Sequence, residues 1–155
     1  LDADWHGADH SAWVYGALAN ELQRRGAPDE DRHELFKRMC FNALVGNDDD
    51  HPKNHAVLWL GQGWRLAPMY DVVPSMDGSS PAYLSMAVGR EGRVINRGNL
   101  LSHAAHFGLA PQQASDLLDE VIGWEPQLRE HYGQQLEGAA LAFALSAIGA
   151  QRMAA

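Results

Sequence analysis

A polar segment at residues 47–55 constrains the fold of this chain more than any other feature. It reads Asn-Asp-Asp-Asp-His-Pro-Lys-Asn-His and separates an apolar run with helical spacing from a short run rich in strand formers. Another carboxylate, Asp71, follows at the end of Pro-Met-Tyr-Asp. Carboxylate and amide oxygens are ligands for divalent cations that also contact phosphates. The pattern predicts a functional loop that lies between a helix and a hairpin. The rest of the chain is interpreted as the scaffold of this loop.

Composition narrows the class of protein. With 155 residues, 46% of them hydrophobic, the chain is large enough for one domain with its own core. Its 12 Lys and Arg against 20 Asp and Glu make direct nucleic-acid binding unfavourable, because such binding depends on neutralising phosphates. No apolar run approaches the length of a membrane span. The single cysteine, Cys40, is interpreted as a buried apolar side chain.

The start of the chain predicts its location and its completeness. Leu1-Asp2-Ala3-Asp4 contains no basic and apolar signal region, so a cytoplasmic protein is expected. The first residue is not methionine, and we therefore expect a piece of a longer protein.

Helical periodicity occupies most of the first 45 residues. A helix is predicted over residues 10–25, with Gly26 as its stop. A helix that Gly46 ends is predicted to run to about Val45. Asp31, followed three residues later by Glu34, predicts a capping box at the start of this helix.

The remaining sequence predicts a hairpin and then helices. Strands are expected at 56–60 and 64–67, because a glycine-rich three-residue loop separates these two apolar runs. Residues 72–98 are rich in Pro and Gly and are predicted to be mainly irregular, with a short extended piece at 83–88. Helices are predicted at 99–107, 111–122 and 125–147, the last with Gly133 and Gly138 as weak points. The fold class is therefore mainly α, a helical bundle with a small β-hairpin beside the polar loop.

The spacing within the polar segment selects one of its three consecutive acids. Protein kinases place an Asn five residues after the catalytic Asp, and a further metal-binding Asp lies downstream. Asp49 is five residues before Asn54, whereas Asp48 and Asp50 are six and four residues before it. Asp49 is therefore the candidate catalytic residue, and Asp48 and Asp50 are interpreted as loop charges.

Other interpretations of the same residues remain open. His51 and His55 have the spacing of two metal ligands on a helix, but Pro52 disfavours a helix there and no third ligand lies nearby. Zinc is therefore disfavoured. His51 can instead be a structural histidine bonded to the loop backbone, and Lys53 a simple surface charge.

Two stretches of the chain carry a family resemblance. Phe41–His55, with its Asp-Asp-His-Pro-Lys-Asn core, and Trp64–Asp71, with its terminal Tyr-Asp, resemble the C-terminal lobe of HipA-type serine/threonine kinases. These kinases are the toxins of HipBA toxin–antitoxin systems. The helical remainder of the chain is compatible with that lobe but not diagnostic of it.

The resemblance implies a site and a biological role. Asp49 would be the catalytic aspartate. Asn54 and Asp71 would bind Mg²⁺ and would also line the ATP site. The other cofactor-binding residues implied are His51, Lys53 and Tyr70. In this family the toxin phosphorylates a serine of a protein, typically an aminoacyl-tRNA synthetase, which halts translation and favours persistence. The usual partner is a small DNA-binding antitoxin, HipB.

The chain departs from a complete kinase. It contains no Gly-rich phosphate loop and no strand lysine of the Val-Ala-Ile-Lys kind. Both belong to an N-terminal lobe, so residues 1–155 are expected to be the C-terminal domain alone and inactive by themselves. Two other functions remain open: a non-catalytic module that binds an antitoxin or another partner, and a metal-dependent phosphohydrolase.

Overall fold

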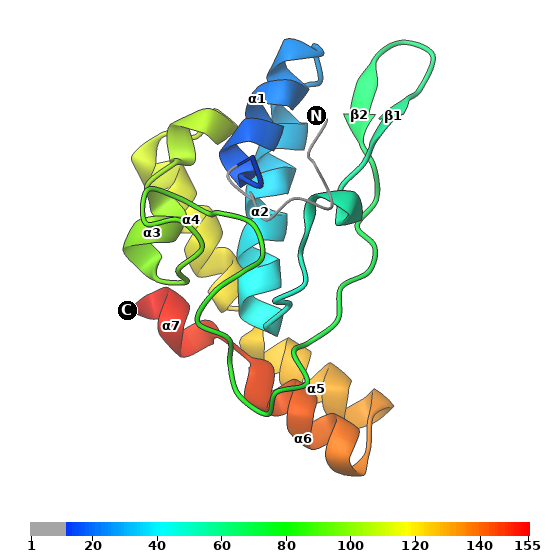
Figure 1. Ribbon diagram of the computed structural model, residues 1–155, viewed down its shortest axis with the longest axis vertical. Helices are drawn as coiled ribbons and strands as arrows, with labels where there is room; N and C mark the ends of the chain where they lie inside the picture. Colours follow the sequence, from blue (N-terminus) through cyan, green and yellow to red (C-terminus); the bar gives the residue numbers. More distant parts are fainter. Residues whose placement is uncertain (1–11) are drawn as a thin grey trace.

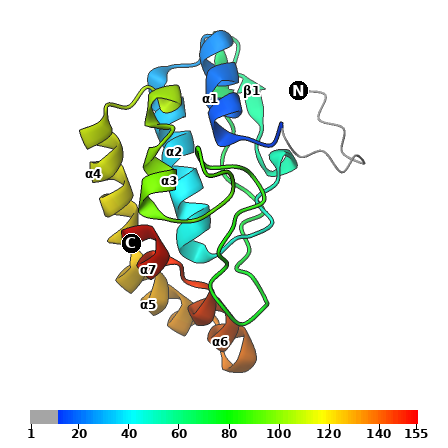
Figure 2. The ribbon, with the colours of Figure 1, turned by 60° about the vertical axis from the view of Figure 1, so that its left-hand side comes forward.

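A computed structural model describes residues 12–155 (Figure 1). The Leu1-Asp2-Ala3-Asp4 start and the first two residues of the helix expected at 10–25 lie outside the described residues. The fold is mainly helical with one two-stranded antiparallel sheet, as the sequence predicts. In both ribbon views the long helix α2 lies between α4 and the β-hairpin (Figure 2).

The first two helices pack against each other. Helix α1 covers Tyr15–Arg24 and α2 covers Asp29–Val45. Gly46 ends α2 in the left-handed conformation at φ 71°, where glycine has no Cβ penalty. The predicted capping box is wrong, because Asp31 lies inside the first turn of α2. Its carboxylate accepts hydrogen bonds from Arg65 and from the backbone N–H of Leu66 instead.

The predicted hairpin is confirmed. Strand β1 covers Val57–Trp59 and pairs with β2, Trp64–Leu66, in antiparallel register. The N–H of Leu60 donates to the carbonyl of Gly63 at 3.1 Å and closes the turn. The hairpin projects beside α1 in Figure 1.

The chain from residue 67 to 96 is irregular, as expected, and runs between distant parts of the molecule. Near Gly78 it passes the ring of Phe143 in the C-terminal region, and it then returns towards α1. There the N–H of Ala87 donates to the carbonyl of Trp13, and the N–H of Tyr15 donates to the carbonyl of Ala87. These two bonds attach the 83–88 piece to the start of α1.

The C-terminal half contains more breaks than the sequence predicts. The helices are α3 (Arg97–Leu101), a 3₁₀ turn η2 (Ala104–Phe107), α4 (Pro111–Ile122), α5 (Glu125–Gln135), α6 (Gly138–Ala147) and α7 (Ala150–Ala154). Helix α4 confirms its prediction. The single helix expected at 99–107 is wrong: Ser102 bonds the carbonyl of Asn99 through its hydroxyl, and such local bonds compete with helix continuation.

The prediction of a single long helix over 125–147 is also wrong. Helix α5 stops after Gln135, and Gly138 has φ 56°, a left-handed conformation that a continuous helix does not contain.

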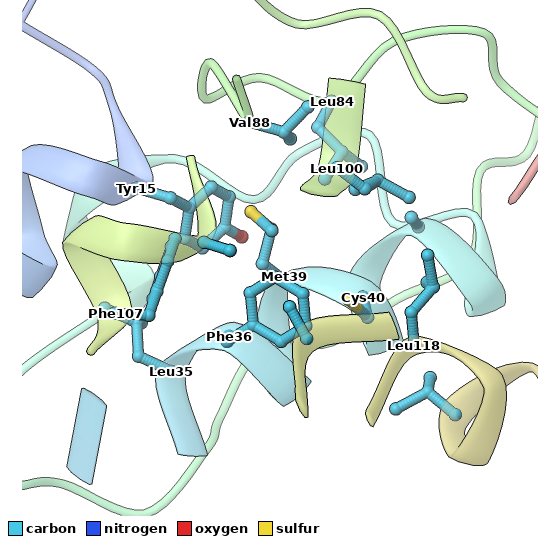
Figure 3. Close-up of a cluster of buried hydrophobic side chains, with 14 of the residues drawn as sticks. Tyr15, Leu35, Phe36, Met39, Cys40, Leu84, Val88, Leu100, Phe107 and Leu118 are labelled. Carbon is cyan, nitrogen blue, oxygen red and sulfur yellow. The ribbon is translucent and has the colours of Figure 1, made fainter. Parts of the chain in front are cut away.

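One face of α2 forms the centre of the core (Figure 3). Phe36 meets the ring of Phe107 edge to face with 5.3 Å between centroids. Cys40 is fully buried, which confirms its interpretation and raises the pKa of its thiol far above the usual range. A core centred on α2 holds the C-terminal end of this helix, and with it the start of the polar segment. None of the helices in residues 12–155 combines the length and apolar character needed to cross a membrane.

Candidate functional site

The polar segment 47–55, hereafter the 47–55 loop, leaves the C-terminal end of α2 directly. It ends in a 3₁₀ turn, η1 (Pro52–Asn54), and continues into β1. The N–H of Asn54 donates to the carbonyl of His51 at 2.9 Å and closes this turn. A loop directly between a helix and a strand is the arrangement that the sequence predicts.

Asp49 and Asn54 are brought together by this turn. The side chain of Asp49 is 81% exposed, whereas Asn54 is buried. The Asn54 side chain donates from Nδ2 to the backbone carbonyl of Asp49 at 3.1 Å. With Nδ2 engaged in this way, the Oδ1 atom of Asn54 is the part of the amide suited to a cation. Together with the carboxylate of Asp71, this amide oxygen forms a donor set that fits a hard cation such as Mg²⁺.

The other candidate residues surround this pair. His51 Nε2 lies 3.9 Å from Asp49 Oδ1, so the imidazole is close to the exposed carboxylate. The hydroxyl of Tyr70 donates to the backbone carbonyl of Lys53 at 2.6 Å. Because Asn54 follows Lys53 and Asp71 follows Tyr70, this bond joins the two segments that carry the candidate metal ligands.

Asp71 has an uncommon backbone conformation. Its φ of 57° is the one positive value at a non-glycine residue within 12–155. Asp tolerates the left-handed region better than most residues, but such conformations are concentrated at functional sites. The side chain belongs to an exposed residue, so its carboxylate is accessible to a ligand.

Asp50 was missed by the sequence prediction. Its interpretation as a loop charge is wrong, because the residue is 0% exposed. Tyr15 donates its hydroxyl to Asp50 Oδ2 at 2.6 Å, and the N–H of Ser85 donates to Oδ1 at 2.5 Å. Burial raises the pKa of Asp50 to about 7, and these hydrogen bonds only partly oppose the rise. Asp48, in contrast, is half-buried.

His55 lies on the inner side of the loop. Its ring meets that of Tyr15 edge to face, with 5.3 Å between centroids. Burial, assisted by the charge of Arg38, lowers the pKa of His55 to about 4, so the ring is neutral near pH 7. Within residues 12–155 no three His, Cys, Asp or Glu side chains are grouped so that they could hold a metal ion. The His51/His55 zinc interpretation thus gains no third ligand from the described chain.

A cavity of about 360 Å³ lies beside the loop, between α1 and β1. Its walls are mostly apolar, and charged side chains from α1 and the loop line part of it. The residues that define it include Val14, Leu18, Arg25, Lys53, Val57 and Met86.

Comparison with known proteins places the chain in a family. The model of the HipA-like C-terminal domain matches residues 4–127, and the chain belongs to this family. The resemblance drawn from the polar segment is thereby confirmed.

Two relatives from Sinorhizobium fredii (strain NBRC 101917 / NGR234) are named "Putative kinase", Y4mE and Y4dM. Y4mE is 40% identical over 58 residues, which are 36% of this chain and 14% of Y4mE. Y4dM is 26% identical over 96 residues, which are 59% of this chain and 24% of Y4dM. The chain thus matches much less than two thirds of the length of either relative.

A solved structure shares the fold. A chain of the Shewanella oneidensis MR-1 complex of HipA, HipB and operator DNA aligns with a TM-score of 0.72 at 20% sequence identity. The alignment covers 95% of this chain and 38% of the Shewanella chain. The mainly α fold with its small hairpin is therefore that of the matched part of the Shewanella chain.

Proposed function

We propose that residues 1–155 form the C-terminal catalytic lobe of a HipA-like protein kinase. The complete protein would transfer the γ-phosphoryl group of ATP to a serine of a protein target. One observation carries the proposal: the side-chain amide of Asn54 donates to the backbone carbonyl of Asp49 at 3.1 Å, while the Asp49 carboxylate beside it is 81% exposed. The family match and the relatives named as kinases support the same chemistry.

The proposed roles follow from the chemistry of each group. Asp49 would accept the proton of the attacking serine hydroxyl, which requires an exposed carboxylate within hydrogen-bond reach. Asn54 and Asp71 would hold Mg²⁺, which takes one or two carboxylates and shares the phosphate oxygens of its nucleotide. Mg²⁺, when bound, supplies charge neutralisation at the phosphates.

The nucleotide would also contact three groups near Asn54 and Asp71. Lys53 carries the positive charge suited to phosphate, and His51 lies beside Asp49. Tyr70 would be the third of these groups, and its hydroxyl, which donates to the carbonyl of Lys53, keeps it beside the lysine.

The role of the complete protein is proposed by relation to its family. It would be a cytoplasmic toxin of a toxin–antitoxin system, with a HipB-like DNA-binding antitoxin as partner. The Shewanella complex, in which HipA is found with HipB and operator DNA, supports this partner class. A family-typical substrate would be an aminoacyl-tRNA synthetase. The net charge of −8 disfavours direct DNA contact by this lobe and so supports the antitoxin as the DNA-contacting component.

A second function is favoured by one sequence observation. Residues 1–155 contain no Gly-rich phosphate loop, so this chain by itself would not transfer phosphate efficiently. A lobe of this kind could instead act only as a binding module for an antitoxin or another partner.

Nucleotide binding by the chain tests the proposed site. The chain is titrated with a non-hydrolysable ATP analogue and Mg²⁺ by calorimetry, beside the Asp71→Asn variant, which removes the charge but tolerates the left-handed backbone. We expect weak binding that requires Mg²⁺ and is lost in the variant. Binding of equal strength in the variant would reject Asp71 as a ligand.

Phosphotransfer by the full-length parent separates the two functions. The parent is expected to phosphorylate a serine, and Asp49→Asn is expected to abolish this while the protein stays folded. Undiminished transfer by the Asp49→Asn parent would exclude Asp49 as the catalytic residue. A folded parent that binds its antitoxin but transfers no phosphate would favour the binding module.

A further inference from the structure

Two consecutive residues of the 47–55 loop have opposite surroundings. The side chain of Asp49 is 81% exposed, whereas Asp50 is 0% exposed. A carboxylate is costly to bury and is tolerated only with hydrogen-bond partners. The position of Asp50 is therefore determined by its partners in the protein, and its backbone is constrained with it.

These partners come from both directions along the chain. Tyr15, at the start of α1, is 35 residues before Asp50, and Ser85, in the irregular segment, is 35 residues after it. Ser85 holds the loop twice, since its hydroxyl also donates to the backbone carbonyl of Asp48 at 2.7 Å. Asp50 thus attaches the loop to two separate parts of the fold.

A second series of hydrogen bonds leads from Tyr15 back to Asp49. Asn42 donates from Nδ2 to the hydroxyl oxygen of Tyr15 at 2.9 Å. Asn47 donates from Nδ2 to Asn42 Oδ1 at 3.1 Å, and its own Oδ1 accepts from the N–H of Asp49 at 3.3 Å. Asn42, Asn47 and Asp50 are all buried. A buried polar network whose members are satisfied makes the local structure rigid and unique.

We propose that Asp50 is the positioning residue of the loop: its two-sided anchoring turns the Asp49 carboxylate outward and keeps Asn54 against the Asp49 carbonyl. What Asp49 and Asn54 do chemically rests on the proposed function, but their placement by Asp50 does not. Asp50 itself is too buried to touch a substrate or nucleotide.

The two donors also explain why an acid is needed here. Tyr15 O–H and Ser85 N–H each donate to a different oxygen of Asp50. An Asn at this position has nearly the same shape, but it would face one of these donors with its own NH₂ group. Asp50→Asn therefore disturbs the anchoring with little change in volume. Tyr15→Phe removes one anchor and leaves the other.

The first test measures how Asp49 and Asn54 are placed in the 155-residue chain, without metal or nucleotide. The amide signal of Asp49 and the side-chain NH₂ signals of Asn54 are followed by NMR in Asp50→Asn, Tyr15→Phe and the double variant. The matched control is Asp48→Asn, which removes a charge from the same loop at a half-buried position. We expect the Asn54 side-chain signals to move in both single variants and to stay in the control. The Asp49 amide is read in Tyr15→Phe alone, because Asp49 is the chain neighbour of residues 48 and 50.

The double variant is expected to show shifts at least as large as those of Asp50→Asn, because Tyr15→Phe also removes the hydroxyl that accepts from Asn42. A merely structural role would lower the midpoint of thermal unfolding but leave the folded-state side-chain signals of Asn54 in place. That result would overturn the proposal.

The second test measures the consequence with the ATP analogue and Mg²⁺. Supporting partners behind a ligand commonly change affinity by about tenfold to a hundredfold. We expect the dissociation constant to rise about tenfold or more in Asp50→Asn and to stay within about twofold in Asp48→Asn. Equal affinity in wild type and Asp50→Asn would overturn the proposal. If the wild-type chain binds no nucleotide, the proposed function is weakened, and the NMR result alone decides the positioning role.

Discussion

At the scale of single residues, Tyr15 contacts two titratable side chains, the buried Asp50 and the half-buried His55. Its hydroxyl donates to Asp50, and its ring meets His55. Burial disfavours the charged form of each side chain. It therefore raises the pKa of Asp50 and lowers that of His55. The two residues therefore make opposite contributions to the dependence of stability on pH.

The signs follow from proton binding in the two states. Folding raises the pKa of Asp50 from 3.8 to about 7, so the folded state binds more protons and the contribution of Asp50 is lost as pH rises through this range. Folding lowers the pKa of His55 from 6.5 to about 4, so its contribution is gained as pH rises from about 4 to 6.5. In wild type the two effects largely cancel between pH 4 and 6.5.

Replacing either residue is expected to reveal the pH dependence of stability that the other contributes. Relative to wild type, Asp50→Asn is expected to gain free energy of unfolding as pH rises from about 4 to 7, and His55→Gln to lose it between about pH 4 and 6.5. Each difference should be on the order of 3–4 kcal/mol across its range. Urea unfolding at a series of pH values measures both. Curves for the two variants that run parallel to wild type would contradict the assignment.

Within the candidate site, the sequence predicts the contacts between residues close in the chain but not those between distant residues. The Asp49/Asn54 step is local, so five positions along the chain suffice to predict that one turn brings them together. Asp50 differs because its burial depends on Tyr15 and Ser85, each 35 residues away. No pattern within the loop distinguishes a buried Asp from an exposed one, and the interpretation as a loop charge failed for this reason.

At the scale of elements, the β-hairpin is attached to α2 by one buried carboxylate. The single N–H of Arg65 Nε is shared between the two oxygens of Asp31, at 3.0 and 3.1 Å, and Arg65 Nη2 donates to Asp31 Oδ1 at 2.8 Å. Asp31 also accepts the N–H of Leu66 at 2.7 Å. The guanidinium beside it holds the pKa of Asp31 below its usual value. This contact fixes β2 against the helix that leads into the 47–55 loop.

Asp31→Ala is expected to loosen the hairpin. The loss should be about 1–2 kcal/mol, since a charge-assisted buried contact is removed but the Arg65 side chain is 48% exposed. Glu30→Ala is the matched control, because it makes the same kind of change in the same turn at an exposed position. Urea unfolding gives the free energies, and amide exchange in β1 and β2 should accelerate only for Asp31→Ala. Equal losses in both variants would assign the effect to the helix terminus instead.

The elements also show where periodicity fails as a predictor. Helix α4 was predicted from its apolar spacing and Pro111, both local signals. The breaks within 99–107 and 125–147 depend on a hydroxyl bond at Ser102 and on the left-handed backbone of Gly138. Apolar spacing continues across both breaks and so does not show where a helix stops. It also overstates burial over 125–147, since no residue of α5 is buried.

At the scale of the whole molecule, residues 138–155 support the site although the family match ends at residue 127. Met153 is 0% exposed in the core. The N–H of Gly149 donates to the carbonyl of Leu44 at 2.8 Å, and the N–H of Ser75 donates to that of Gly46 at 2.8 Å. The C-terminal turn and the irregular segment therefore both hold the end of α2, from which the 47–55 loop starts.

Gly149 makes this packing possible, and its replacement is the sharpest test of it. A Cβ at Gly149 would collide with the backbone carbonyl of Ala43 in α2. Gly149→Ala is therefore expected to cost about 1–3 kcal/mol, the usual range for forced overpacking. Because the displaced contact lies at the end of α2, amide exchange in the 47–55 loop should accelerate as well.

Gly133→Ala provides the matched control, since a Cβ there meets no atom within 4 Å. Gly133 lies inside α5, where alanine is the better helix former, so this change should be neutral or stabilising by up to about 1 kcal/mol. Urea unfolding of both variants gives the comparison. If Gly149→Ala were as stable as Gly133→Ala and left exchange in the 47–55 loop unchanged, the C-terminal turn would have no part in holding the site, and the lobe would end functionally where the family match ends.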